Sequence, residues 1–166
     1  YLVDNGYVVL IPAYRPSSGF GKELAKLDNP QKAMEDISAT VNYLRGLPQV
    51  DGLHIGVIGE SFGGMAMLNF IAQQPDLFAA AVDFSGPTDL VTWYRDTPSS
   101  RPVLTFGLGG TPEQKPEIYR AFSPVNVVER IKIPILIVHG DADQLVPLSQ
   151  ASEMVEALKK AHKEHQ

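Results

Sequence analysis

The feature that most constrains this chain is the stretch from Gly59 to Gly64, which reads Gly-Glu-Ser-Phe-Gly-Gly. A short apolar run over residues 54–58 precedes it, and a helix-like apolar pattern over residues 65–71 follows it. A strand, a G-x-S-x-G turn and a helix in this order are typical of a nucleophile elbow, in which a serine hydroxyl stands clear of a sheet edge. We expect positions 59 and 63 to require glycine, because side chains at these positions would collide where the strand folds back into the helix. The pattern predicts that Ser61 is a nucleophile.

The amide that follows the serine adds to this interpretation. Phe62 would open the helix, and its backbone N–H would point out of the first turn with the helix dipole behind it. Such an amide can donate a hydrogen bond to an oxyanion. The competing interpretation is a glycine-rich strand-to-helix turn in which the serine is incidental.

Composition excludes several classes of function. The chain has 166 residues and a formal net charge of −5, with no cluster of Lys and Arg, so we expect no nucleic-acid partner. No apolar run approaches the roughly 20 residues of a membrane span, so we expect no membrane partner. The absence of cysteine excludes disulfides, thiol chemistry and Cys-ligated zinc. No cofactor is expected.

Apolar runs and helical patterns alternate along the chain. The run Tyr7–Ile11 predicts a strand buried on both faces, as in a parallel sheet. Asn29 is expected to cap a helix that has Pro30 at its first position and ends at Gly46. Further strands are expected over residues 54–58, 78–82 and 133–138, and helices from the elbow to about residue 74 and from about residue 149. This alternation predicts an α/β fold with a doubly wound, mostly parallel sheet.

One segment does not fit the alternation. Residues 85–124 hold many prolines and glycines, and we expect an excursion with short helices there rather than a sheet element. Its aromatic residues either line a substrate pocket or cover a small core: Trp93, Tyr94, Phe106 and Tyr119. No repeat or linker divides the chain, so residues 1–166 are interpreted as one domain.

A serine nucleophile needs a base, and the base needs an orienting acid. The strongest candidate is Asp143, which follows the buried run 133–138; Asp141 is the second choice. Catalytic groups gather beyond the carboxyl ends of parallel strands, which is where both acids fall. A D-x-D pair also occurs in metal sites, but the further acids of a calcium loop are missing, so no metal is predicted. A solvated turn acid is the other interpretation of Asp143.

No histidine is well placed to be the base. His162 and His165 lie in a polar run that we expect at the end of the last helix. His139 lies just before the acid turn and is expected to be packed and hydrogen-bonded, and His54 begins the strand before the elbow, at its wrong end. The base is therefore expected from outside this chain.

These motifs together resemble the catalytic domain of the prolyl oligopeptidase family of serine peptidases, within the α/β-hydrolase superfamily. Residues 6–21 are similar to the family's strand and Arg-Gly-Ser-x-Gly-Tyr-Gly loop, with Pro16 where Gly is usual. The stretch Gly59–Gly64 matches the Gly-x-Ser-Tyr/Phe-Gly-Gly elbow, which implies the nucleophile role for Ser61. Residues 133–140, followed by Asp143 and Val146-Pro147, match the segment that carries the acid, which implies that role for Asp143.

The resemblance also implies that pieces of the family's domain lie outside this sequence. The His-Gly-Gly-Pro loop that completes the oxyanion hole would precede residue 1, and the strand and loop carrying the histidine would follow residue 166. We therefore expect a partial α/β-hydrolase domain, truncated at both ends, whose exposed sheet edges favour self-association. The implied function is peptide-bond cleavage through an acyl-enzyme. A carboxylesterase with the same machinery and a non-catalytic binding module remain alternatives.

Overall fold

A computed structural model describes residues 1–15, 17–24 and 30–166, and it divides the chain into two compact units, residues 1–55 and 56–166. Two positions singled out in the sequence, Pro16 and the expected helix cap Asn29, lie outside the described residues.

The first unit contains the short 3-10 helix η1 (Val3–Asn5) and the helix α1 (Pro30–Arg45). α1 begins with Pro30 and is followed by Gly46, as the sequence predicts. Its apolar positions recur at helical spacing and are buried: Ala33, Met34, Ile37 and Val41. The Arg15 guanidinium donates to the Asp36 carboxylate of α1, with 2.8 Å from Nε to Oδ2, and this contact holds the pKa of Asp36 below its ordinary value.

The strand expected over Tyr7–Ile11 is absent, so that prediction is wrong. These residues carry no regular secondary structure, and Val8, Val9 and Ile11 are exposed. A strand exists only where a neighbour accepts and donates its backbone hydrogen bonds. Within the described residues, no strand pairs with this run.

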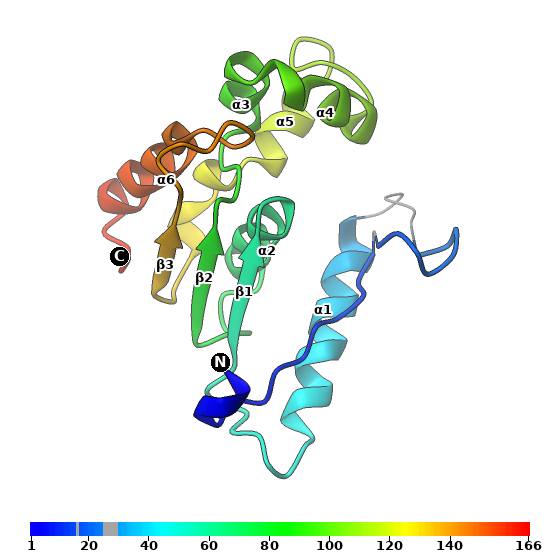
Figure 1. Ribbon diagram of the computed structural model, residues 1–166, viewed down its shortest axis with the longest axis vertical. Helices are drawn as coiled ribbons and strands as arrows, with labels where there is room; N and C mark the ends of the chain where they lie inside the picture. The colour runs from blue at the N-terminus through cyan, green and yellow to red at the C-terminus, as the bar shows by residue number, and fades with distance from the viewer. Residues whose placement is uncertain (16, 25–29) are drawn as a thin grey trace. The chain divides into compact units, whose positions relative to one another are not determined.

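The second unit is built on a three-stranded parallel sheet with the order β1-β2-β3. The strands are β1 (Gly56–Glu60), β2 (Ala80–Phe84) and β3 (Ile135–Val138), drawn side by side in Figure 1. All three were expected, and each begins two residues later than the sequence suggested. Asp83 in the middle strand is in register with Gly59 of β1 and with Ile137 of β3.

Two long helices accompany this sheet: α2 (Phe62–Gln73), which follows β1, and α6 (Leu148–Lys160), which follows β3. α2 is apolar on nearly every side, and eight of its residues are buried, from Gly64 to Ala72. A helix of this composition can lie only in the interior of the fold.

The segment between β2 and β3 is helical and adds no strand to the sheet. It holds α3 (Leu90–Asp96), α4 (Arg101–Leu108) and α5 (Pro116–Phe122), together with the 3-10 turns η2 (Pro98–Ser100), η3 (Pro124–Asn126) and η4 (Val128–Arg130). Figure 1 shows these helices grouped beyond the carboxyl ends of the strands. They lie on the side of the sheet where Ser61 and Asp143 are found.

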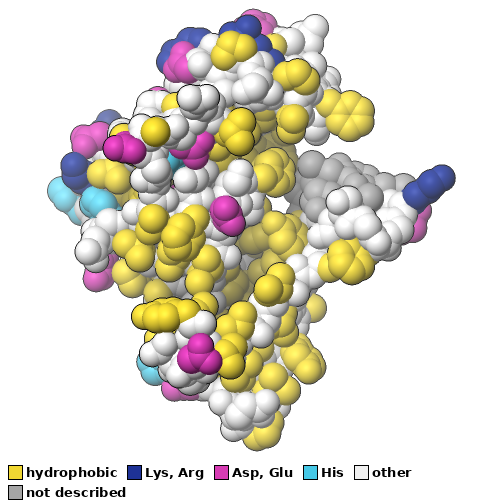
Figure 2. All heavy atoms as spheres, in the orientation of Figure 1, with side chains coloured by type: hydrophobic (Ala, Val, Ile, Leu, Met, Phe, Trp, Pro, Cys, Tyr) yellow, Lys and Arg dark blue, Asp and Glu magenta, His cyan; other side chains and the backbone are white. Residues whose placement is uncertain are grey.

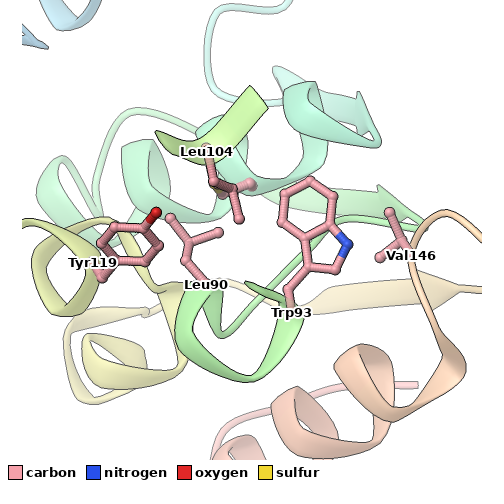
Figure 3. Packing of buried hydrophobic residues seen from close by; sticks show 6 residues of the cluster. Leu90, Trp93, Leu104, Tyr119 and Val146 are labelled. Atoms are coloured by element: carbon pink, nitrogen blue, oxygen red, sulfur yellow. The ribbon is translucent and has the colours of Figure 1, made fainter. Parts of the chain in front are cut away.

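This helical segment shares one hydrophobic cluster with the rest of the unit (Figure 3), made of Met65, Leu90, Trp93, Leu104, Tyr119 and Val146. Met65 comes from α2 and Val146 from the loop after β3, so the cluster joins both to α3, α4 and α5. The Trp93 indole also donates to the Leu145 carbonyl at 2.8 Å. Trp93 and Tyr119 are thus core residues, whereas Phe106 is 93% exposed. For Trp93 and Tyr119, the interpretation that the aromatic residues of this segment cover a small core is correct.

The chain does not end on a helix as expected. α6 stops at Lys160, His162 takes a positive φ of 54°, and the chain then turns back alongside β3. The Ile135 amide donates to the Glu164 carbonyl at 3.2 Å, and the Ile137 amide to the Gln166 carbonyl at 2.8 Å. His165 thus forms a parallel bridge with Ile135, because extended backbone pairs with the free edge of β3.

Candidate active site

Ser61 occupies the turn between β1 and α2. Its backbone has φ 52° and ψ −122°, a conformation that a residue with a Cβ adopts only under strain. The Ser61 amide donates to the Phe84 carbonyl at 2.8 Å, and the Ser61 carbonyl accepts from Met65 at 3.2 Å to begin α2. The residue is exposed, and its hydroxyl caps no amide of α2. A strained turn with a free hydroxyl is the geometry of a nucleophile elbow.

The glycines of this turn are required for different reasons. A Cβ at Gly59 would strike the backbone of Gly63 and Gly64, so position 59 tolerates only glycine. A Cβ at Gly64 would strike the Asp83 carboxylate below it. A Cβ at Gly63 would meet nothing within 4 Å, so the expected collision of a Gly63 side chain is wrong. Instead, the backbone of Gly63 lies close to Gly59, which is why position 59 has no room for a side chain.

Phe62 is the first residue of α2. An amide at this position has no acceptor within its own helix, because the chain four residues earlier still belongs to the strand and turn. It is therefore free to donate to a negatively charged oxygen near Ser61. The Phe62 side chain is 45% exposed and remains at the surface beside the turn.

Asp143 lies in the loop between β3 and α6, and its carboxylate is held by backbone amides. Oδ1 accepts from Leu145 at 2.8 Å and from Val146 at 3.0 Å. The Val146 amide is the main cause of a pKa below the ordinary Asp value. The carboxylate therefore stays ionised. Asp141, the second choice, is exposed in the same loop.

Backbone hydrogen bonds tie the ends of the three strands together. Beside the bond from Ser61 to Phe84, the Ser85 amide donates to the Val138 carbonyl at 2.9 Å. Ser85 also has a positive φ of 50°, and its side chain contributes to lowering the pKa of Asp143. Ser61, Ser85 and the loop that bears Asp143 therefore lie in sequence along the carboxyl edge of the sheet.

The four histidines of the sequence lie in different surroundings. His54 precedes β1, where its Nδ1 lies 2.7 Å from Asp51 Oδ2. His165 pairs with Ile135, the first residue of β3, and so lies toward the amino end of the sheet. His162 follows α6, and the Nε2 of His139 is occupied by the Val146 carbonyl at 2.7 Å.

One buried acid beside the site, Asp83, was missed in the sequence, whereas His139 was expected to be packed and hydrogen-bonded, and that prediction is confirmed. Asp83 is 1% exposed, and the His139 side chain is 2% exposed. Within the described residues, neither carboxylate oxygen of Asp83 nor the Nδ1 of His139 has a partner with good hydrogen-bond geometry, although the Gly86 amide lies close enough to lower the pKa of Asp83. Burial raises the pKa of Asp83 to about 6. The sequence signal that could have revealed Asp83 is a single acid inside an apolar run, because acidic side chains are rarely buried without a partner.

Over the described ranges 1–15, 17–24 and 30–166, no group of three or more His, Asp or Glu side chains is arranged to hold a metal ion. The same residues include no helix that is both long and apolar enough to cross a bilayer.

A family model described as the prolyl oligopeptidase family matches residues 1–166. The chain belongs to this family. Among curated relatives, it is 32% identical to the uncharacterized peptidase YtmA of Bacillus subtilis, over 96% of this chain and 61% of the relative. It is 29% identical to dipeptidyl aminopeptidase BIII of Pseudoxanthomonas mexicana, over 95% of this chain and 24% of that protein.

Solved structures of family members have the same α/β-hydrolase fold. The acylaminoacyl peptidase of Pyrococcus horikoshii superposes with a TM-score of 0.79 at 29% identity, covering 91% of this chain and 25% of that one. A puromycin-hydrolyzing peptidase of Mycobacterium tuberculosis gives a TM-score of 0.80 at 26% identity, covering 92% and 24%. This member of the prolyl oligopeptidase family therefore spans about a quarter of these structures.

Proposed function

We propose that the protein is a serine peptidase that cleaves peptide bonds through an acyl-enzyme on Ser61. The observation that carries this proposal is the strained, exposed Ser61 at the same sheet edge as the ionised Asp143. Membership of a peptidase family supports a hydrolase, and the turn geometry favours Ser61 as the serine that would react.

Each residue has a separate role in the proposed reaction. The Ser61 oxygen attacks the carbonyl carbon of the substrate while a histidine takes its proton, and a covalent acyl-serine forms as the amine leaves. The Phe62 amide donates to the oxyanion of the tetrahedral intermediate. Asp143 accepts from the histidine, fixes its tautomer and stabilises its charged form.

We infer that this histidine comes from outside the 166 residues. A general base must approach the serine oxygen to about 3 Å, directly or through one water. His54 precedes β1 in the chain and His165 pairs with the first residue of β3, whereas Ser61 follows the carboxyl end of β1. His139 already donates from Nε2 to a backbone carbonyl, so it is not free to turn toward Ser61.

Peptides are the substrates we propose, because the named relatives include a dipeptidyl aminopeptidase and acylamino-acid-releasing enzymes. The side chains next to the reacting groups are consistent with an apolar substrate residue. Phe62, Phe84 and Leu145 are 45%, 40% and 70% exposed. Hydrophobic side chains are also visible over much of the surface in Figure 2.

The test uses the full-length protein that contains this chain. A fluorophosphonate probe is expected to label Ser61 and to lose its target in Ser61→Ala, whereas Ser152→Ala, an exposed serine of α6, serves as the matched control. Turnover of peptide anilides above that of p-nitrophenyl esters supports a peptidase, and the reverse order indicates an esterase. Absence of labelling in a folded wild-type protein would refute the proposal.

A further inference from the structure

The segment that links β2 to α3 joins the carboxyl ends of the neighbouring strands. This bridging segment, residues 84–89, runs from the last residue of β2 to the residue before α3. The Phe84 carbonyl accepts from the Ser61 amide at 2.8 Å. The Ser85 amide donates at 2.9 Å to the carbonyl of Val138, the last residue of β3. At its start, the bridging segment is therefore hydrogen-bonded to the Ser61 turn and to β3.

Gln150 binds the other end of the bridging segment. It is the third residue of α6, just beyond the acid loop (residues 139–147), and it is 1% exposed. Its Oε1 accepts from the Thr88 and Asp89 amides, each at 2.9 Å. Its backbone carbonyl accepts from the Thr88 hydroxyl at 2.6 Å. Both ends of the acid loop are thus hydrogen-bonded to the same short segment.

The amide of the Gln150 side chain uses both its oxygen and its nitrogen in this contact. Backbone N–H groups only donate, so the Gln150 oxygen must face Thr88 and Asp89, and the nitrogen then faces α3. Nε2 donates to Thr92 Oγ1 at 2.7 Å and lies 3.5 Å from Glu153 Oε2. Thr88 is fully buried, so replacing the Gln150 amide by an apolar group leaves the Thr88 N–H without an acceptor.

Asp143 depends on the end of the acid loop that Gln150 holds. Its Oδ1 accepts from the amides of Leu145 and Val146, which lie in the last turn of the loop. Pro147 follows, and its carbonyl accepts from the Gln150 amide at 2.9 Å. A shift of the first turn of α6 would therefore move the amides that hold Asp143, and it would leave the turn after β1 in place.

We propose that Gln150 is a positioning residue that sets the distance between the nucleophile Ser61 and the orienting acid Asp143. It does so through the bridging segment, which is hydrogen-bonded to the Ser61 turn at one end and to Gln150 at the other. Gln150 is buried, so it acts through Asp143 rather than on the substrate. This role rests on the proposed function, whereas the attachment of the acid loop by Gln150 does not.

Amide hydrogen exchange tests whether Gln150 holds the acid loop, without any assay of activity. In the full-length protein, Gln150→Met keeps the length of the side chain but removes its amide. We expect exchange of the Val146 amide to become about 10-fold faster, because local opening of the loop then breaks fewer hydrogen bonds. Gln73→Met, in an exposed glutamine at the end of α2, is the matched control and should leave this rate unchanged. An unchanged rate in Gln150→Met overturns the proposal.

The positioning role is tested by steady-state kinetics on peptide anilides, well below the melting temperature. Gln150→Met is expected to lower kcat by about 100-fold with little change in KM, as small displacements of catalytic groups do. The acid limb of kcat/KM should also move to lower pH, because a histidine further from its carboxylate has a lower pKa. A role in stability alone would lower the melting temperature and leave kcat and the acid limb unchanged, and that result overturns the proposal.

Gln150→Glu is the second variant, in case Gln150→Met does not fold. A carboxyl group accepts from the two backbone amides in either state, but only its protonated form can also donate to Thr92 as the amide does. Burial beside Glu153 raises the pKa of the introduced carboxyl. Three further charged side chains act on Glu153: Asp89, Arg95 and Asp96. The ratio of kcat in Gln150→Glu to kcat in wild type should therefore rise as the pH falls, and a ratio that does not change with pH overturns the role.

The proposed function and the role of Gln150 fail in distinguishable ways. Fluorophosphonate labelling of the wild-type protein reports the nucleophile Ser61, whatever the role of Gln150. A wild type that is labelled and turns over, with Gln150→Met equal to it in kcat and in exchange, refutes only the role of Gln150. A folded but unlabelled wild type refutes the peptidase mechanism and the positioning role, and exchange of the Val146 amide then decides whether Gln150 holds the acid loop.

Discussion

The turn around Ser61 and the loop around Asp143 lie at the same sheet edge, but different forces shape them. The turn is determined by sterics, because Gly59 lies against the backbone of Gly63 and Gly64 lies against Asp83. The loop is determined by polar contacts, in which Asp143 accepts two amides and His139 and Trp93 donate to the Val146 and Leu145 carbonyls. A steric turn leaves a glycine signature in a sequence, whereas a hydrogen-bonded loop leaves almost none.

The largest expected effect tests which acid serves Ser61. In the full-length protein, Asp143→Asn should lower kcat by about 10⁴-fold, because an amide stabilises the wrong tautomer of the histidine. Asp141→Asn is the control from the same loop, and its exposed side chain predicts a kcat close to that of wild type. Steady-state kinetics with a peptide anilide measures both. Equal losses in the two variants would mean that the loop, rather than one carboxylate, is required.

The next effect uses pH to probe Asp83, the buried acid that lies against Gly64 of the Ser61 turn. The pKa of Asp83 rises from 3.8 to about 6 on folding, which corresponds to about 3 kcal/mol as an order of magnitude. Because the folded state binds this proton more tightly, its stabilisation is complete below pH 3.8 and is lost as the pH rises through 6. Relative to Asp83→Asn, the wild-type protein should therefore lose stability between pH 4 and pH 6.

Melting temperatures of the two proteins over this pH range measure the difference. Asp143 titrates with the opposite sign: its lowered pKa stabilises the folded state above the ordinary Asp range, and this is lost in acid. The comparison of wild type with Asp83→Asn cancels that contribution, because both proteins keep Asp143. Parallel melting curves at every pH would contradict a buried, proton-binding Asp83.

A double-mutant cycle between Gly64 and Asp83 tests whether sterics determine the turn. Gly64→Ala places a Cβ against the Asp83 carboxylate and should destabilise the protein by about 1–3 kcal/mol, as overpacking does. Asp83→Ala removes the obstructing group, so the double variant should recover part of the loss. Thermal unfolding of the two single variants and the double variant gives the coupling. Purely additive losses would show that Gly64 is required for another reason.

The sequence allowed the sheet, the elbow and the acid loop to be predicted, and the reasons are specific. Ser61 stands among glycines whose spacing only a sharp turn explains, and Asp143 follows an apolar run. The strands begin two residues late because apolar character marks burial, whereas strand limits depend on pairing: Phe78 is buried but unpaired. The strand predicted over Tyr7–Ile11 was wrong for the same reason, since an apolar run does not show which strand would pair with it.

The pairing of His165 with β3, and the neighbourhood of the segments that carry Asp83 and His139, could not be predicted from local patterns. A histidine in a polar run looks like a solvated helix end, and only the free edge of β3 makes it part of a sheet. Asp83 and His139 are 56 positions apart in the chain, and only the pairing of β2 with β3 brings their segments side by side. Contacts of this kind follow from topology rather than from any local pattern.

The smallest effect concerns the contact that joins the acid loop to the helical segment. Trp93→Phe keeps an aromatic ring in the cluster but removes the donor to the Leu145 carbonyl. Loss of one hydrogen bond costs about 1 kcal/mol, or about 2–4 °C in melting temperature for a domain of this size. If polar contacts shape the loop, kcat should also fall a few-fold, because Leu145 and Val146 supply the amides that hold Asp143.

Tyr94→Phe, a partly buried aromatic at the edge of the same cluster, is the matched control, since it keeps the indole bond. A lower melting temperature with unchanged kcat would show that the amides of Leu145 and Val146 hold Asp143 without help from Trp93.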